Sequence, residues 1–268
     1  MLAVLISPLI KWRIARNVTA WVGLILIVMA APPFSWTVIC VLFFAFTLWY
    51  YVWNGPRASA TLRVGAGITL TALLVVAVSI EYPHRRLPKL VGTGDDHIVV
   101  IGDSISAGLD PRISWPTLLQ QSVGIHSRNL SRVGATARDA IQMATQVSTD
   151  DRLVLIEIGG NDMIAGVPAA EFGQSLKTVL QRLQSPGRTI VMMELPLLPY
   201  RLGYGQLQRK LASEYGVQLI PKRSFVEVIS GANATSDGLH LTVEGARRMA
   251  FLIARVFAPV LKVAPIRG

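Results

Sequence analysis

Four short polar segments of the chain contain residue types that can work together in nucleophilic catalysis. Ser104 lies in a Gly-Asp-Ser triplet, and Asp237 precedes His240 by three residues near the C-terminus. A serine hydroxyl becomes nucleophilic when a base takes its proton, and a histidine oriented by a carboxylate is a suitable base. The backbone N–H groups of Ser104 and Gly134 and the side-chain amide of Asn161 are candidate donors to a developing oxyanion. Each segment alone is a weak signal, but the four together predict nucleophilic serine chemistry.

The elements that must position these residues alternate between strand and helix over residues 95–268. Apolar, β-branched runs separated by helical patterns are typical of a parallel sheet covered on both faces. We therefore predict a three-layer α/β/α, doubly wound domain, in which chemistry belongs at the carboxyl ends of the strands. Three of the four polar segments directly follow predicted strands. The predicted strands are 97–101, 125–130, 152–158, 189–194 and 217–220, and the predicted helices are 115–123, 136–147, 169–183, 206–214 and 242–260.

The N-terminal third has the composition of a membrane region. The whole chain is 51% hydrophobic and only 16% charged, whereas soluble domains average about 25% charged residues. Residues 17–56 contain no charged side chain and are interrupted by Pro32-Pro33. Since about 20 apolar residues cross a bilayer, we predict a membrane region over residues 1–80, a linker over 81–94 and a catalytic domain over 95–268. The three predicted membrane helices are 17–31, 34–53 and 62–80.

The charge distribution favours a membrane topology over nucleic-acid binding. The net charge is +10, and residues 1–94 hold eight basic side chains against one acidic side chain. These charges flank apolar runs. Because Lys and Arg are enriched in the cytoplasmic loops of membrane proteins, their positions predict how the helices are oriented in the membrane. With three spans, the N-terminus is inside and the domain that follows lies outside. If the first run is too short to cross, only two spans remain and the domain would lie inside. We expect three spans.

The sequence contains little material for a metal or cofactor site. Cys40 is the only cysteine, and the four histidines form no His-Glu-x-x-His motif. Gly92-x-Gly94 lacks the third glycine and the helix of a dinucleotide-binding loop. We expect no metal, no cofactor and no nucleic-acid partner, and the oligomeric state is open.

From about His97 to Val260 the chain resembles the SGNH (GDSL-type) serine hydrolase family. The phrases IGDSISAGLD, IEIGGNDMIAG and SDGLH, and the loop over residues 195–205, are similar to the branch of bacterial arylesterases, thioesterases and lysophospholipases. The resemblance implies Ser104 as the nucleophile, Asp237 and His240 as its acid and base, and an oxyanion hole formed by Ser104, Gly134 and Asn161. The sequence departs from the family pattern at Ile105, where leucine is usual, at Leu241, where proline is common, and in the loose SRVGAT segment around Gly134.

Apolar residues beside the predicted site suggest the substrate class. Ile164, Leu197, Leu198 and Tyr200 are expected to form a pocket for the acyl or aryl part of a small-molecule or lipid ester. We therefore expect a membrane-anchored serine esterase of a bacterial inner membrane, with its catalytic domain on the periplasmic side, acting on acyl, aryl, lysophospholipid or thio-esters. The alternatives are an O-acetyl esterase or acyltransferase acting on envelope glycans, and a catalytically silent binding module.

Overall fold

The computed structural model describes residues 13–91 and 97–261. The chain divides into a helical unit, which contains the residues up to Arg85 and the segment Leu197–Leu202, and an α/β unit, which contains the remainder from Arg86 onward. The predicted linker, 81–94, contains the point at which the first unit ends, although its last three residues lie outside the described residues. The predicted domain boundaries otherwise stay predictions.

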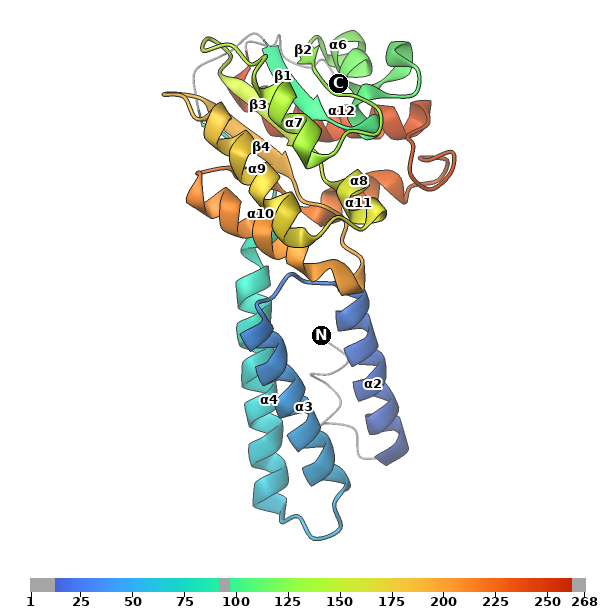
Figure 1. Ribbon diagram of the computed structural model, residues 1–268. Coiled ribbons are helices and arrows are strands. Elements are labelled where there is room, and N and C mark those ends of the chain that lie inside the picture. Colours follow the sequence, from blue (N-terminus) through green and yellow to red (C-terminus); the bar gives the residue numbers. More distant parts are fainter. Residues whose placement is uncertain (1–12, 92–96, 262–268) are drawn as a thin grey trace. The chain divides into compact units, whose positions relative to one another are not determined.

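The helical unit contains three long helices, α2 (Arg13–Ala30), α3 (Trp36–Asn54) and α4 (Ala60–Glu81) (Figure 1). Ser35 and Ser59 cap the last two, each accepting a hydrogen bond from a backbone N–H three residues later. All three helices are long and apolar enough to cross a membrane, judged by length and composition. The first helix begins four residues before the predicted 17–31, at Arg13, and its 18 residues extend about 27 Å.

Small and aromatic residues hold the three helices together. Ala20, Phe46, Trp49 and Leu74 are buried in the centre of the helical unit, and Trp21 contacts Phe46 edge-on with ring centroids 5.4 Å apart. Most other large apolar side chains of these helices point outward. The fully outward-facing ones include Phe43, Phe44 and Ile68, whose exposed fractions are 65%, 71% and 64%. This surface is the reverse of the one that a water-soluble helix bundle presents.

The α/β unit is built on a five-stranded, entirely parallel sheet with the order β2-β1-β3-β4-β5. The first three strands, β1 (His97–Gly102), β2 (His126–Asn129) and β3 (Leu153–Glu157), lie close to the predicted positions, as do β4 (Thr189–Met193) and β5 (Gln218–Ile220). The strand order reverses direction between β1 and β3. The carboxyl ends of these two strands therefore form the switch point at which open α/β sheets bind ligands.

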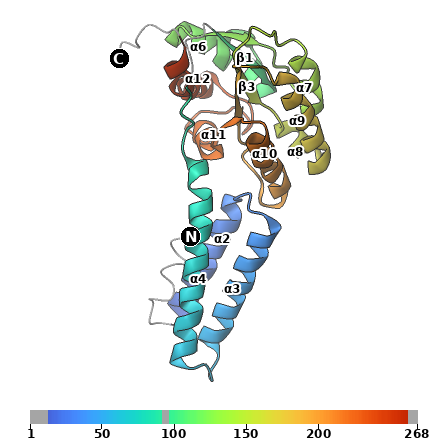
Figure 2. The ribbon, with the colours of Figure 1, turned by 90° about the vertical axis from the view of Figure 1, so that its left-hand side faces the viewer.

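Helices cover both faces of the sheet, and the predicted three-layer fold is confirmed (Figure 2). On one face lie α6 (Trp115–Val123), α11 (Lys222–Ile229) and α12 (Val243–Phe257), which bury side chains such as Trp115 and Phe257 against the sheet. On the other lie α7 (Ala137–Ala144), α9 (Ala169–Leu183) and α10 (Leu202–Glu214). Two short helices, α5 (Ser104–Ala107) and α8 (Gly160–Ala165), and helix α11 were not expected from the sequence pattern.

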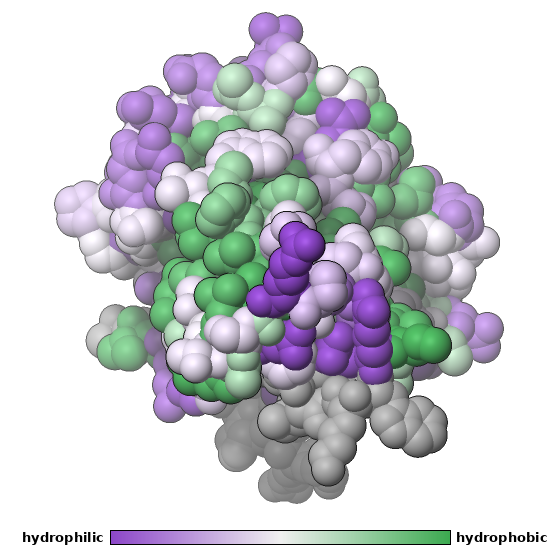
Figure 3. All heavy atoms as spheres, turned by 90° about the horizontal axis from the view of Figure 1, so that it is seen from below, coloured by the Kyte–Doolittle hydropathy of each residue, from purple (hydrophilic) through white to green (hydrophobic). Residues whose placement is uncertain are grey.

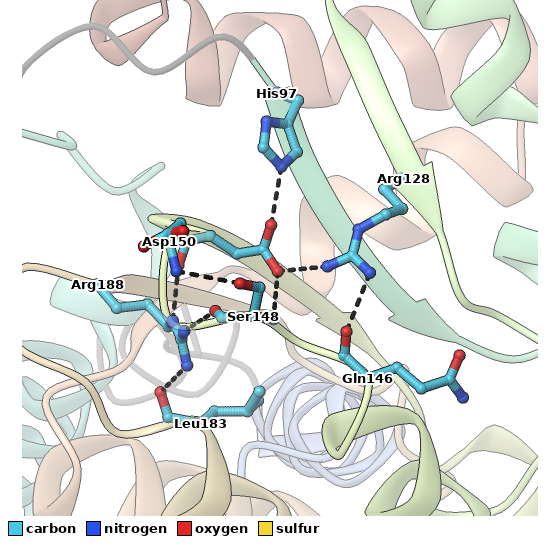
Figure 4. A network of polar contacts seen from close by, with 8 residues as sticks. His97, Arg128, Gln146, Ser148, Asp150, Leu183 and Arg188 are labelled. Carbon is cyan, nitrogen blue, oxygen red and sulfur yellow. Dashed lines mark hydrogen bonds and ion pairs between the residues drawn. The ribbon is translucent and has the colours of Figure 1, made fainter.

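The amino ends of the strands are joined by a polar network around Asp151 (Figure 4). The buried Asp151 carboxylate pairs with Arg128, contacts His97 Nε2 at 2.9 Å and accepts the backbone N–H of Ser148 at 2.6 Å. Arg188 donates to the backbone oxygen of Asp151 at 2.8 Å. Burial opposes ionisation, but these hydrogen bonds and the Arg128 charge lower the pKa of Asp151. The network fixes β1 and β2 to the loop before β3, at the end of the sheet opposite the polar Gly-rich segments.

Candidate active site

Ser104 is the first residue of helix α5, immediately after β1. Asp103 caps this helix, because its Oδ1 accepts the backbone N–H of Ile105 at 2.9 Å. A first-turn N–H has no partner inside its own helix, and within residues 13–91 and 97–261 the N–H of Ser104 has no backbone acceptor elsewhere. The turn from strand to helix therefore presents both the Ser104 hydroxyl and a backbone donor at the switch point of the sheet.

His240 is held in a tight loop before α12. Asp237 accepts the backbone N–H groups of Leu239 and His240 at 2.9 and 2.8 Å through Oδ1, while Oδ2 lies 2.6 Å from His240 Nδ1. The backbone N–H and then the imidazole of His240 lower the pKa of Asp237 well below its ordinary value. The carboxylate is thus ionised at neutral pH, and it favours the tautomer in which Nδ1 carries the proton and Nε2 is the free base.

A close approach between this loop and α12 fixes the position of His240. Thr242 caps α12 by accepting the N–H of Gly245 at 3.2 Å, and its own N–H donates to Ala234 at 3.0 Å. A Cβ added at Gly245 would lie 2.0 Å from the Ala234 carbonyl oxygen. The helix can pass this close to the loop because residue 245 has no side chain.

Ser104 and His240 line the same cavity, which has a volume of about 240 Å³. No hydrogen bond joins their side chains among the described residues, and such bonds are often long or absent in unliganded hydrolases. The other lining residues come mostly from α5, the turn after it and the start of α6. The apolar ones among them are Ile105, Leu109, Ile113, Trp115, Leu241 and Ala246.

Asn161 connects the segments that contain Ser104 and Gly134. It lies in α8, directly after β3, and its Nδ2 donates to the Ala135 carbonyl at 2.9 Å and weakly to Asp103 Oδ2 at 3.4 Å. The amide therefore lies between the neighbours of the other two candidate oxyanion donors. Gly134 adopts a φ of +76°, which favours glycine, and its N–H donates to no backbone oxygen among the described residues.

Two acidic side chains near the turn that contains Ser104 are buried, Asp103 and Glu157. Glu157, at the end of β3, accepts the hydroxyl of Ser106 at 2.9 Å, and Trp115 Nε1 donates to the same hydroxyl at 3.2 Å. Glu157 Oε2 also lies 3.5 Å from the backbone N–H of Asp103, which donates weakly to it. Burial, followed by the Asp103 charge, raises the pKa of Glu157 well above its usual range, and burial raises the pKa of Asp103 to about 6.

Glu157 was not among the predicted site residues, although the sequence contains a signal for it. It is the only charged residue in the apolar run LVLIEI, and an acidic residue in a buried strand needs a partner. The other acidic neighbours of the site brace loops. Asp103 caps α5, and Asp162 accepts the N–H of Ala137 at the start of α7 at 2.9 Å.

The four residues predicted to form the substrate pocket do not line the cavity beside Ser104. Ile164, on α8, is 61% exposed, and Leu198 and Tyr200 are 41% and 75% exposed. Leu197 is likewise absent from the cavity wall. Their part in substrate binding stays a prediction. Among the described residues, no group of three or more His, Cys, Asp or Glu side chains is arranged to hold a metal ion.

Comparison with known proteins assigns the α/β unit to a family. Residues 100–248 match the GDSL-like Lipase/Acylhydrolase family. The chain is 27% identical over 180 residues to Esterase TesA of Pseudomonas aeruginosa, covering 61% of this chain and 89% of that protein. It is 30% identical over 177 residues to an arylesterase of Vibrio mimicus, covering 60% of this chain and 87% of that protein.

Solved structures give the same result. A crystal structure of TesA matches with a TM-score of 0.53 and 26% identity over 62% of this chain and 99% of that one. Helices α2, α3 and α4 lie before the matched family region, so the likeness concerns the α/β unit. The chain belongs to the GDSL-like lipase/acylhydrolase family, and it is an ester hydrolase.

Proposed function

We propose that the chain is a membrane-anchored serine esterase whose nucleophile is Ser104. The observation that carries this proposal is that Ser104 and His240 line one cavity while Asp237 holds His240 through Nδ1. His240 Nε2 takes the hydroxyl proton as Ser104 Oγ attacks the ester carbonyl carbon. The carbonyl oxygen becomes an oxyanion, which receives hydrogen bonds from the Ser104 and Gly134 N–H groups. The Asn161 amide supplies a third bond with the Nδ2 hydrogen that makes only the 3.4 Å contact with Asp103 Oδ2, while its other hydrogen stays on the Ala135 carbonyl.

The second half of the reaction restores the enzyme. Collapse of the tetrahedral intermediate breaks the ester C–O bond, and His240 gives its proton to the departing alcohol or phenol. A water molecule then attacks the acyl-enzyme, His240 accepts one of its protons, and the carboxylic acid leaves as Ser104 recovers the proton. The Nδ1–Asp237 hydrogen bond stabilises the imidazolium that forms in both halves.

The size and lining of the cavity favour esters with a short acyl group. Small-molecule sites generally have volumes of about 300–1,000 Å³, and the cavity beside Ser104 has about 240 Å³. Its apolar wall, which includes Ile105, Ile113 and Leu241, suits an alkyl chain. We expect the highest kcat/KM for acetyl to butyryl groups in a series of p-nitrophenyl esters that extends to palmitoyl.

Membrane anchoring rests on the three apolar helices and their outward-facing apolar surface. Arg13, Arg16, Arg57 and Arg63 all lie where α2 begins or α3 and α4 meet. Since basic residues stay on the cytoplasmic side, α4 then ends on the periplasmic side, where the catalytic domain follows. A reporter fused after Val260 that is active only in the cytoplasm would overturn this topology, whatever the hydrolytic activity.

The nucleophile is tested by labelling the full chain in detergent with a fluorophosphonate probe. We expect the wild type and the matched variant Ser127→Ala, which removes a serine on β2, to be labelled, and Ser104→Ala to be unlabelled and inactive. Labelling of Ser104→Ala to the wild-type extent would refute the assignment. An acceptor alcohol that outcompetes water in product analysis would instead favour acyl transfer.

A further inference from the structure

Basic side chains gather at one end of the helical unit, and no acidic side chain of residues 13–91 and 97–261 pairs with them. Arg13 and Arg16 lie in the first turn of α2, and Arg63 lies in the first turn of α4. We call these three residues the arginine cluster. Residues 1–80 contain no Asp or Glu. Glu81 is 18 residues along α4 from Arg63, about 27 Å for a helix. Hence no carboxylate of the membrane helices can neutralise the cluster.

Arg16 is the central member of the cluster and is built into the protein. Only 6% of its surface is exposed, and its guanidinium lies 4.8 Å from the ring centroid of Trp53. The indole of Trp53 is itself fixed, because Nε1 donates to the Arg63 carbonyl at 3.0 Å. The buried Nε of Arg16 has no hydrogen-bond partner among the described residues, and the buried Nε of Arg63 has none there either.

Neutral polar groups hold the other members in place. Arg13 Nε donates to Asn54 Oδ1 at 3.0 Å, and Asn17 Nδ2 donates to the same oxygen at 2.9 Å. Arg63 Nη2 donates to the Gly55 carbonyl at 3.1 Å. These contacts keep the guanidinium groups together despite their mutual repulsion, and within the part of the chain that the structure describes they bring no negative charge to the cluster. Figure 3 views this end of the molecule and shows hydrophilic residues gathered in its middle, next to hydrophobic ones.

A buried cation without an anion is costly, so the cluster calls for an anion from outside the helices. Guanidinium groups bind phosphate oxygens through paired N–H donors, and basic pockets between membrane helices bind anionic lipid headgroups. We propose that the arginine cluster is a binding site for the phosphate of an anionic phospholipid in the cytoplasmic leaflet. This inference rests on the membrane topology of the proposed function and is independent of ester hydrolysis.

The test is native mass spectrometry of the full chain in a neutral detergent with added phosphatidylglycerol or phosphatidylcholine. We expect retained phosphatidylglycerol on the wild type and a loss of about tenfold or more in Arg16→Gln, because charge-assisted hydrogen bonds are removed. The matched control is Arg57→Gln, which removes the same charge from an exposed position in the loop between α3 and α4. Its affinity should stay within about twofold of the wild type.

Three outcomes would overturn the proposal. One is an equal loss in Arg57→Gln and Arg16→Gln, which would mean that only general charge attracts the lipid. Another is equal retention of phosphatidylcholine and phosphatidylglycerol by the wild type. The third is displacement of phosphatidylglycerol by an equal concentration of inorganic phosphate, which would assign the site to a soluble anion. Fluorophosphonate labelling of each variant shows that its catalytic domain is folded, and an Arg63→Gln variant repeats the test if Arg16→Gln unfolds.

Discussion

The replacement Asp237→Asn changes one heavy atom and tests the proposed role of the loop that contains Asp237 and His240. Asp237 uses its two oxygens differently: Oδ1 accepts the N–H groups of Leu239 and His240, and Oδ2 faces His240 Nδ1. An asparagine can keep its oxygen on the two backbone donors and preserve the loop. Its NH₂ group then faces Nδ1 as a donor, so Nδ1 must become the acceptor and Nε2 must carry the ring proton. An Nε2–H cannot take the proton of Ser104.

The expected decrease in activity depends on how far the side chains of Asp237 and His240 are exposed to water. In serine hydrolases with a buried aspartate, this change lowers kcat by about 10⁴. The Asp237 side chain here is 51% exposed and the His240 side chain is 26% exposed. Water can therefore solvate the imidazolium and accept the Nδ1 proton in part of the population, which reduces the penalty. We expect kcat/KM to fall by about 10²–10³ for p-nitrophenyl butyrate at neutral pH.

The assay is a pH series of kcat/KM for the wild type, Asp237→Asn and Ser104→Ala in the same detergent. The thermal unfolding midpoints of the wild type and Asp237→Asn should agree, because the backbone bonds of the loop remain. Retention of more than about a tenth of the wild-type kcat/KM by a folded Asp237→Asn would refute the role given to Oδ2. A fall that is accompanied by unfolding of the loop would show that Oδ1 is the important atom.

Four further changes test other parts of the site and fold. Asn161→Ala should lower kcat about 10²–10³-fold with little change in KM, since one oxyanion donor is lost; a mainly KM effect would contradict this. Gly245→Ala should lower kcat/KM at least tenfold by displacing the His240 loop, measured beside fluorophosphonate labelling. Asp151→Asn should lower the free energy of unfolding by about 1.5–3 kcal/mol at pH 7. Because the pKa of Asp151 is lowered in the folded state, the greater stability of the wild type is present above the pKa of the unfolded state and disappears as pH falls through the pKa of the folded state. Glu157→Gln should leave the unfolding midpoint near that of the wild type in acid and raise it increasingly as pH rises above the pKa of an unfolded glutamate, because the raised folded pKa of Glu157 means that the folded state favours the proton that is lost there; identical pH profiles would show that the pKa of Glu157 is the same in the folded and unfolded states.

The sequence predicted the candidate nucleophile and base because their signals are local. A Gly-Asp-Ser turn after an apolar strand and an Asp-x-x-His loop can be recognised without knowing what lies nearby. The alternation of strands and helices also predicted the parallel sheet, because hydrophobic periodicity is a property of neighbouring residues. The same reasoning found the three long apolar helices but placed the start of the first one too late, since Arg13 and Arg16 were taken to lie outside it.

Only the tertiary structure decided which distant groups meet. Glu157 lies 51 residues from Ser106, and Asn161 lies 26 residues from Ala135, yet each pair is hydrogen bonded. The wall of the cavity likewise comes from residues near 105–115 and 240–246, which are separated in sequence. Hydrophobic patterning fixes which face of an element is buried, but the partner of a buried polar group depends on strand order and helix packing. The local sequence therefore determined the chemistry available to this protein, and the fold determined which residues surround it.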